Sequence, residues 1–147
     1  MFDLKTKLAT AAILVAAVSA SPAIAAQCAT PGTNALANAP TMPKGVTDTV
    51  IGNIDLGPEI SVGGRQLRTR RLAVQPGGIV PLHSHKDRPA LIYTLSGSIT
   101  EYSSICSVPI EHKAGGISRE AGGLSHYWIN HGNVPAVLLS SDVFHAM

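Results

Sequence analysis

The fold of this chain is decided by residues 77–97, GGIVPLHSHKDRPALIYTLSG, which set two histidines one residue apart inside an apolar segment. In an extended strand alternate side chains point to the same face, so His83 and His85 are expected to face the same way. Two neighbouring imidazoles on one face have two interpretations. They are core histidines whose nitrogens bond backbone carbonyls, or they are part of a metal site.

Short apolar runs of strand length surround this segment, from Val46 to the end of the chain. Gly-Gly, Pro-Gly-Gly and Ser-Gly sequences separate them, and a turn is expected at residues 76–78. Many short strands in one small chain indicate a sandwich or a barrel. We therefore expect an all-β fold with a single domain over residues 46–147. The expected strands cover residues 50–56, 65–74, 90–97, 98–105, 115–121, 126–130 and 136–144.

A third histidine lies where a later strand begins. His126 follows the Gly122-Gly123 turn and is distant in sequence from His83 and His85. Inside a barrel, two imidazoles from one strand and a third from another strand can point at a single ion. Neutral imidazole is a ligand for zinc, copper, iron and nickel, whereas magnesium and calcium prefer oxygen. From the spacing alone, a metal site and three separately satisfied buried histidines both remain open.

The glycines around the first two histidines add a second pattern. Gly77 is followed by five residues, His-x-His and a closing glycine at Gly97. In this spacing residues 77–97 resemble the first motif of the cupin superfamily. That motif also has a glutamate seven residues before the closing glycine, and Ala90 stands there in this chain.

Residues 115–130 resemble the second cupin motif. Gly115, Gly123 and His126 keep its spacing. Ala121 replaces its proline, a change that affects a turn and not the chemistry. Asn130 ends the motif and is expected to close a turn or to support the strand of His126. The two motifs together carry the resemblance over about residues 65–143.

The resemblance implies a double-stranded β-helix (jelly-roll) barrel with a metal ion near one mouth. It assigns the ligands to His83, His85 and His126, and the cofactor to one divalent transition metal: iron, manganese, copper, nickel or zinc. Because Ala90 has no ligating atom, a three-histidine site with an open position is expected, as in some cupin oxygenases. A small-molecule dioxygenase or isomerase is then implied. The alternatives are a non-catalytic module that binds metal or a small ligand, and a barrel without metal.

Three charged residues lie close to these motifs. Asp87 and Glu120 are the candidates to replace the missing glutamate, either as direct ligands or by hydrogen bonding to an imidazole. Arg88, which Pro89 holds extended, either binds a carboxylate of the substrate or braces its loop against Asp87 or a carbonyl. The remaining histidines, His112, His131 and His145, are expected at the surface.

The N-terminus has the composition of a secretory signal peptide, assigned to residues 1–25. Two lysines precede an apolar run, and small residues fit a cleavage site near Ala25/Ala26. The apolar run is too short for a membrane span. We therefore expect a periplasmic or secreted protein with no membrane association, in which a Pro- and Ala-rich tail, residues 26–45, precedes the domain.

The two cysteines, Cys28 and Cys106, both fall in the part of the chain expected to be exported. In an oxidising compartment an even number of cysteines suggests pairing, and a disulfide here would tie the tail to the domain. Two unpaired thiols are the alternative.

Charge excludes some partners. With 11 basic and 9 acidic side chains the formal net charge is +2, and no basic stripe appears, so nucleic acid and anionic membranes are poor candidates. The one basic cluster, residues 65–71, is expected to be the solvated side of a strand. A small-molecule ligand is therefore the expected partner, and the apolar outer strands favour a homodimer.

Overall fold

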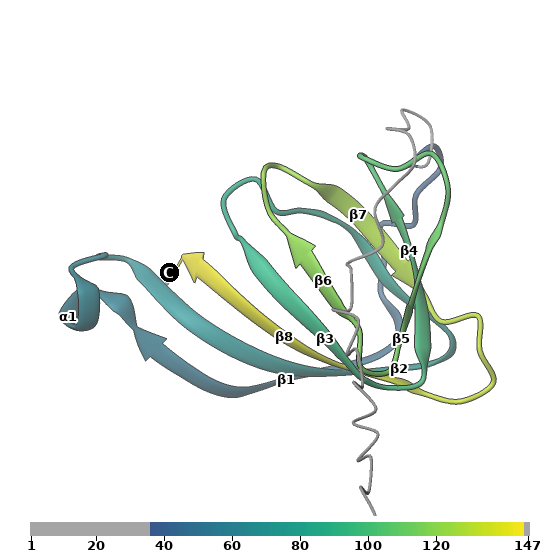
Figure 1. Ribbon diagram of the computed structural model, residues 1–147, viewed down its shortest axis with the longest axis horizontal. Coiled ribbons are helices and arrows are strands. Elements are labelled where there is room, and N and C mark those ends of the chain that lie inside the picture. Colours follow the sequence, from purple (N-terminus) through teal and green to yellow (C-terminus); the bar gives the residue numbers. More distant parts are fainter. Residues whose placement is uncertain (1–35, 146–147) are drawn as a thin grey trace, which may run out of the picture.

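The computed structural model describes residues 36–145 and is built almost entirely of strands (Figure 1). The prediction of an all-β fold is confirmed. Within the described residues there is one short helix, α1 (Leu56–Ile60). The strands are β1 (Lys44–Asp55), β2 (Arg65–Ser84), β3 (Ala90–Ser96), β4 (Ser98–Ser103), β5 (Ile110–Lys113), β6 (Ile117–Glu120), β7 (Ser125–Ile129) and β8 (Ala136–His145).

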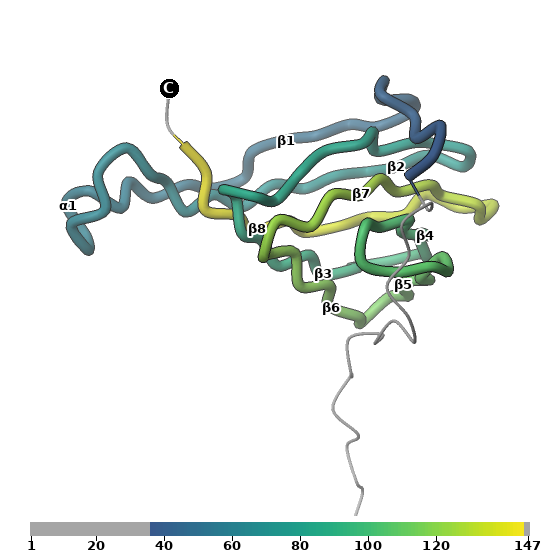
Figure 2. Tube along the Cα trace, turned by 90° about the horizontal axis from the view of Figure 1, so that it is seen from above, coloured from purple at the N-terminus to yellow at the C-terminus, as the bar shows by residue number. Residues whose placement is uncertain are grey.

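The strands form one sheet that curls into a nearly closed jelly-roll barrel (Figures 1 and 2). Their order is β5-β4-β7-β2-β8-β3-β6, and β1 is added to β2. Most neighbours in this order are distant in sequence. The pairing that matters for the site is the one between β2, which carries His83 and ends one residue before His85, and β7, which carries His126.

β2 changes its partner partway along its length. Residues Arg65–Val74 pair with β8, whereas residues from Ile79 to Ser84 pair with β7. Between the two stretches, Gly77 has a positive φ of 69°, and a Cβ on Gly78 would lie 2.7 Å from a backbone oxygen. The turn predicted at residues 76–78 is therefore wrong. These glycines form a bend that lets one long strand serve two neighbours.

Asn130 closes this bend. Gly77 N donates to Asn130 O at 2.8 Å, and Asn130 N donates to Gly78 O at 3.0 Å. The buried side chain of Asn130 also donates to Val74 O at 2.9 Å and to Val134 O at 2.8 Å. Asn130 therefore ties the bend in β2 to the loop between β7 and β8, which is the turn-closing role expected from the sequence.

The core lies inside the barrel because alternate residues of each strand point inwards. In β3, for example, Ala90, Ile92 and Thr94 are buried, and the residues between them are exposed. Burial of one large apolar side chain contributes about 1.5–3 kcal/mol to the stability of the fold. The core therefore stabilises the strands that carry the site. The other core residues are Leu72, Val74, Ile99, Trp128, Ala136 and Leu138.

The arginines of residues 65–71 do not form a solvated face, so that expectation is wrong. Arg68 is half-buried and lies 2.8 Å from Asp142, and Arg65 pairs with Asp87. Arg70 is also half-buried, whereas Arg71 is exposed. The reason is pairing across the strands: Arg68 stands opposite Asp142 of β8, and Arg70 pairs with Asp48 of β1.

Several predictions concern residues that lie outside the described part of the chain. These are the signal peptide at residues 1–25, the first part of the tail, and Cys28. Cys106 lies fully buried in the loop between β4 and β5, and its bond to Cys28 stays a prediction. No helix within residues 36–145 is long and apolar enough to cross a membrane.

Candidate metal centre

Four side chains with metal-binding chemistry meet at one end of the barrel. His83 of β2 and His126 of β7 are register partners in their antiparallel pair. His85 lies one residue beyond the end of β2, and Glu120 is the last residue of β6. We call these four residues the His/Glu cluster. The structure thus brings together the three histidines of the sequence motifs and one of the two acids considered with them.

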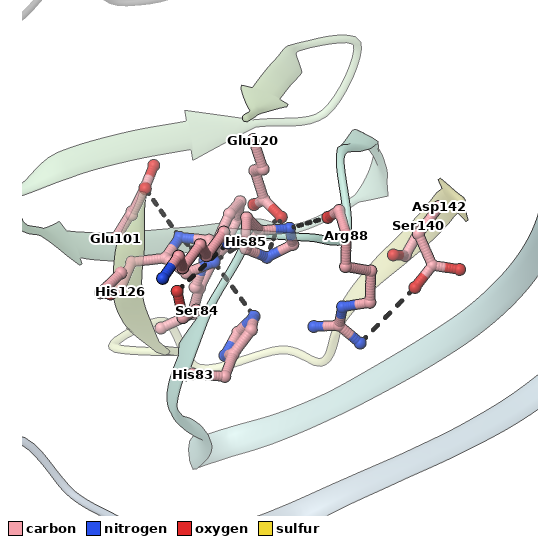
Figure 3. Close-up of polar contacts among 12 residues, drawn as sticks. His83, Ser84, His85, Arg88, Glu101, Glu120, His126, Ser140 and Asp142 are labelled. Atoms are coloured by element: carbon pink, nitrogen blue, oxygen red, sulfur yellow. Dashed lines mark hydrogen bonds and ion pairs between the residues drawn. The ribbon is translucent and has the colours of Figure 1, made fainter. Parts of the chain in front are cut away.

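The members of the His/Glu cluster are close enough to share one ion. One ligand atom of each lies within 4.8 Å of those of the others, and the three imidazole centroids are 4.5 to 5.0 Å apart. His85, Glu120 and His126 have exposed fractions of 2%, 1% and 0%. Figure 3 shows the rings gathered beside the Glu120 carboxylate.

Backbone contacts set the orientation of two of the rings. His83 Nδ1 lies 2.8 Å from Pro81 O, and His85 Nδ1 lies 2.7 Å from Arg88 O. A carbonyl oxygen only accepts hydrogen bonds, so each Nδ1 carries the proton and donates it. In a neutral imidazole the other nitrogen is then a bare acceptor. Nε2 of His83 and Nε2 of His85 therefore point lone pairs into the cluster.

The third ring is oriented by a buried carboxylate. His126 Nδ1 lies 2.8 Å from Glu101 Oε1, and His112 Nε2 lies 2.8 Å from Glu101 Oε2. Burial alone would raise the pKa of Glu101, but the hydrogen bonds from His112 and His126 outweigh it and lower that pKa to about 2. Glu101 is therefore ionised, and His126 Nδ1 donates to it. Trp128 Nε1 also lies 2.9 Å from this nitrogen.

The resulting arrangement fits a metal ion. All three Nε2 atoms are acceptors, yet His83 Nε2 and His126 Nε2 are only 3.1 Å apart. His85 Nε2 lies 2.9 Å from Glu120 Oε2, and neither this nitrogen nor the buried Glu120 Oε1 has a hydrogen-bond partner within the described chain. Facing lone pairs repel one another unless a cation lies among them. Three imidazoles and one carboxylate are a ligand set suited to divalent transition metals.

The acid expected to be missing is supplied from the neighbouring strand. Ala90 of β3 stands at the glutamate position of the first motif, and its register partner on β6 is Glu120. Directly opposite residues of an antiparallel pair project to the same face of the sheet. Glu120 therefore brings a carboxylate to the side of the barrel where Ala90 has none, and the four-residue cluster replaces the expected set of three histidines with a vacancy.

Neither Asp87 nor Arg88 belongs to the His/Glu cluster. Asp87 is exposed and pairs with Arg65 and His145, so it does not join the cluster. Arg88 does not brace its loop against Asp87, as one alternative proposed. Its Nη1 instead faces Asp142 Oδ2 at 3.5 Å, and the side chain lines the cavity beside the histidines (Figure 3).

Two functional residues were missed at the sequence level. Glu101 received no role, and His112 was expected at the surface, which is wrong because its ring is buried against Trp128 with centroids 4.6 Å apart. One feature of the sequence could have indicated that Glu101 is buried. In β4, Glu101 alternates with Ile99 and Ser103, so it has the parity of inward residues, and a charged side chain on an inward face requires a partner.

A cavity of about 400 Å³ adjoins the cluster, within the range of small-molecule sites. His83, His85 and Glu120 form part of its wall. Much of the remaining wall is apolar, and Trp128 also lines the cavity. A small molecule in this cavity would therefore contact the His/Glu cluster directly.

The metal-free protein is expected to lose stability as the pH falls below about 6.5. Burial, and secondarily the adjacent His126, lower the pKa of His83 from 6.5 to about 3. Between these values the unfolded state binds a proton that the folded state does not. The free energy of unfolding should then fall by up to about 1.4 kcal/mol per pH unit through this one group.

Urea unfolding in EDTA between pH 7 and pH 4.5 measures this slope. His83→Gln should flatten it, because the titrating group is gone. The matched variant His131→Gln removes an exposed imidazole and should keep the slope of the parent. An unchanged slope in His83→Gln would contradict the assignment.

Comparison with known proteins agrees with the fold. Residues 70–142 match the family model described as "Cupin domain". Germin-like protein 1 of Brassica napus is 35% identical over 82 residues, which cover 54% of this chain and 40% of that protein. The chain therefore matches less than half the length of this relative.

Two solved structures have the same fold. An oxalate oxidase in complex with the substrate analogue glycolate has a TM-score of 0.53 at 20% identity, over 69% of this chain and 52% of that one. The cupin domain of Schizosaccharomyces pombe Cnp3 has a TM-score of 0.52 at 14% identity, over 69% and 65% of the two chains. At these identities the likeness concerns the fold alone.

Proposed function

This chain contains a cupin-superfamily domain, and from that premise we propose that its His/Glu cluster binds one divalent transition metal ion and acts with it on a small molecule in the adjacent cavity. The reaction class proposed is that of a dioxygenase or an isomerase. The observation that carries the proposal is the convergence of three imidazole Nε2 atoms and one carboxylate, with a hydrogen-bond acceptor beside each Nδ1 outside the cluster.

The metal is proposed to be iron, manganese, copper, nickel or zinc. Imidazole suits iron, copper, nickel and zinc, and one carboxylate extends the ligand set towards manganese. When bound, such an ion supplies Lewis acidity and, except for zinc, redox chemistry. Glu120 would offset one of its two positive charges, so the centre would keep a net charge of about +1.

The chain's own residues prepare the site for this ion. Pro81 O, Arg88 O and the Glu101 carboxylate hold the three rings with their Nε2 atoms turned towards one another. Hydrogen bonds of this kind raise the basicity of imidazole ligands and fix their tautomer. The apolar part of the cavity wall would keep bulk water away from a bound molecule.

A second candidate is a module that binds metal or a small ligand without turnover. One observation favours it. Of the titratable side chains that line the cavity, Asp48 and Arg70 are paired with each other, and the rest belong to the His/Glu cluster or are arginine. No unpaired acid or base separate from the cluster therefore lines the cavity within the described chain, and any catalysis would depend on the metal centre.

We also propose that the protein is exported. The support is the lysine-flanked apolar run and small-residue site of residues 1–25. N-terminal sequencing of the protein from the periplasm of a bacterial host should find a chain that begins near Ala26. A chain recovered only from the cytoplasm with its first residues intact would contradict export.

The test of the proposed function is metal analysis followed by a turnover assay. Tag-free protein is reconstituted separately with each of the five metals, desalted and measured by elemental analysis, and about one ion per chain is expected. The loaded protein is then assayed in an oxygen electrode with thiols, phenols and diketones. Metal with oxygen consumption supports the enzyme, and metal without turnover of any substrate supports the binding module. Failure to take up any metal would refute the enzyme and the metal-binding module, and would leave only a module that binds a small ligand.

A further inference from the structure

A second polar cluster lines the same cavity and has no part in metal binding. It consists of Arg68, Arg70 and Arg88, which gather around Asp142, and we call it the arginine cluster. Arg70 and Arg88 line the cavity, as does Ser140. Figure 3 shows Arg88 between the histidines and Asp142.

The carboxylate of Asp142 is already occupied by one arginine. Arg68 donates to both of its oxygens, from Nε at 3.0 Å and from Nη2 at 2.8 Å. Arg70 Nη2 and Arg88 Nη1 face the same Oδ2 from 3.6 and 3.5 Å. These two distances are long for charge-assisted hydrogen bonds, which are about 2.7–2.9 Å. Asp142 therefore leaves donor capacity on Arg88 unused.

Arg70 also has a donor to spare. Its Nη1 pairs with Asp48, and its Nη2 lies 3.3 Å from Ser140 Oγ. Its buried Nε has no hydrogen-bond partner within the described residues. An unsatisfied buried donor costs free energy, and a ligand in the cavity would satisfy this one only if the Arg70 side chain shifted to expose it.

The charges in this part of the cavity do not balance. Three guanidinium groups face two carboxylates, Asp142 and Asp48, which leaves one positive charge in excess. Burial lowers the pKa of Arg88, and the like charge of Arg70 lowers it further, while Asp142 raises it. Glu120 is one more acid near Arg88, and a divalent ion in the His/Glu cluster would offset it. The cavity with metal bound is therefore electropositive.

The rest of the wall selects against a small, wholly polar anion. Besides Pro43 and Pro81, six apolar side chains line the cavity, and only a ligand with an apolar body would use them. They are Val46, Leu72, Val80, Ile92, Trp128 and Leu138.

We propose that Arg70 and Arg88 bind the anionic group of a small organic acid whose apolar body fills the cavity and whose far end meets the His/Glu cluster. This names the substrate class of the proposed function and rests on it. The specificity would come from a planar guanidinium at one end, which matches a carboxylate, and from metal at the other.

The test uses a matched pair of ligands, hexanoate and hexanamide, which share an apolar body and differ in charge. Binding to the zinc-loaded, tag-free full chain is followed through Trp128, the single tryptophan of the sequence, which lines the cavity. Hexanoate should bind at least about tenfold more tightly than hexanamide, since hydrogen bonds to charged groups are the stronger ones. Oxalate has no apolar body but chelates zinc, so it is compared with hexanoate on the metal-free protein, where it should bind more weakly.

Variants locate the anionic group. Arg88→Gln should weaken hexanoate by at least about tenfold and leave hexanamide unchanged, and Arg88→Lys should recover part of the loss. Asp142 keeps both hydrogen bonds to Arg68 in these variants, so the fold should persist. Arg71→Gln removes an exposed arginine and should bind hexanoate like the parent.

Three outcomes would overturn the proposal: hexanoate no tighter than hexanamide, oxalate tighter than hexanoate on the metal-free protein, or an Arg88→Gln protein that binds hexanoate as well as the parent does. The last result would mean that the carboxylate binds the metal alone. Metal content is measured in every sample. If the parent takes up no metal, the proposed function fails, and hexanoate binding by the metal-free parent and its Arg88→Gln variant still tests the arginine site by itself.

Discussion

The double variant His83→Ala/His126→Ala is expected to retain no stoichiometric metal under conditions in which the parent holds about one ion per chain. It removes two of the four members of the His/Glu cluster, and these two face each other across the β2–β7 pair with their Nε2 atoms 3.1 Å apart. His85 and Glu120 alone would leave most of the ion's coordination to water. A divalent transition metal held by two protein ligands is readily lost to a chelator.

The melting temperature gives an independent readout. Metal that binds the folded state alone stabilises it by about 2.7 kcal/mol when the free metal is about a hundredfold above its Kd, which for a domain of this size raises Tm by roughly 10 °C or more. The parent should show this shift on addition of metal. The double variant should show none.

The control removes the same number of imidazoles elsewhere. His131 and His145 are exposed, and both lie outside the His/Glu cluster. The variant His131→Ala/His145→Ala should therefore keep the metal content and the thermal shift of the parent. Equal loss of metal in both double variants would indicate unspecific binding to surface histidines and would contradict the site.

The fold could be predicted because glycine spacing and strand alternation report it directly. The two motifs place Gly77, Gly97 and Gly115 at backbone positions that the structure finds with positive φ, which glycine adopts without strain. The boundaries of the strands were harder to predict from the sequence. The bend at residues 76–78 has the composition of a turn, and only the change of partner from β8 to β7 makes it part of one strand.

The histidines could be predicted from parity and spacing, but the choice between the two acids could not. Glu120 and Asp87 were equal candidates in the sequence. What separates them is the register of β3 with β6, which sets Glu120 opposite Ala90, whereas Asp87 lies in an exposed loop with Arg65. Register between strands distant in sequence follows from tertiary packing and is not encoded in either strand alone.

The same dependence on tertiary pairing explains why the contacts of Glu101 and of the arginine cluster were not predicted from the sequence. The parity of Glu101 in β4 indicates an inward side chain, but nothing local shows that His112 and His126 will be its two partners. From the sequence, Arg68 and Arg70 were expected at the surface, because their partner Asp142 is more than seventy residues away along the chain. Polar networks inside barrels are assembled by pairing across strands. The sequence can therefore indicate that a single polar residue points inwards, but not which residues it contacts.

Glu120→Gln is expected to lower the affinity for divalent metal by at least about a hundredfold, since even groups that only orient metal ligands are worth roughly 10–100-fold. Glutamine keeps the size of the side chain and loses the charge that the ion would meet. Metal affinity is measured by competition with a chromophoric chelator, and a melting curve without metal establishes that the variant is folded. An affinity equal to that of the parent would mean that the histidines hold the metal without the acid.

Exchange of the two residues tests why the acid is found on β6. Ala90 and Glu120 are register partners, and both are buried, so Glu120→Ala/Ala90→Glu moves the carboxylate across the strand pair without changing the total side-chain volume. Directly opposite side chains share a face, and this exchange should therefore recover at least about tenfold in affinity over Glu120→Ala, within the range expected for groups at a metal site. The matched exchange Glu120→Ala/Ala90→Gln has the same volume without the charge and should recover nothing. Recovery by both exchanges would attribute the effect to packing, whereas recovery by the glutamate alone would mean that either strand can supply the acid to the same centre.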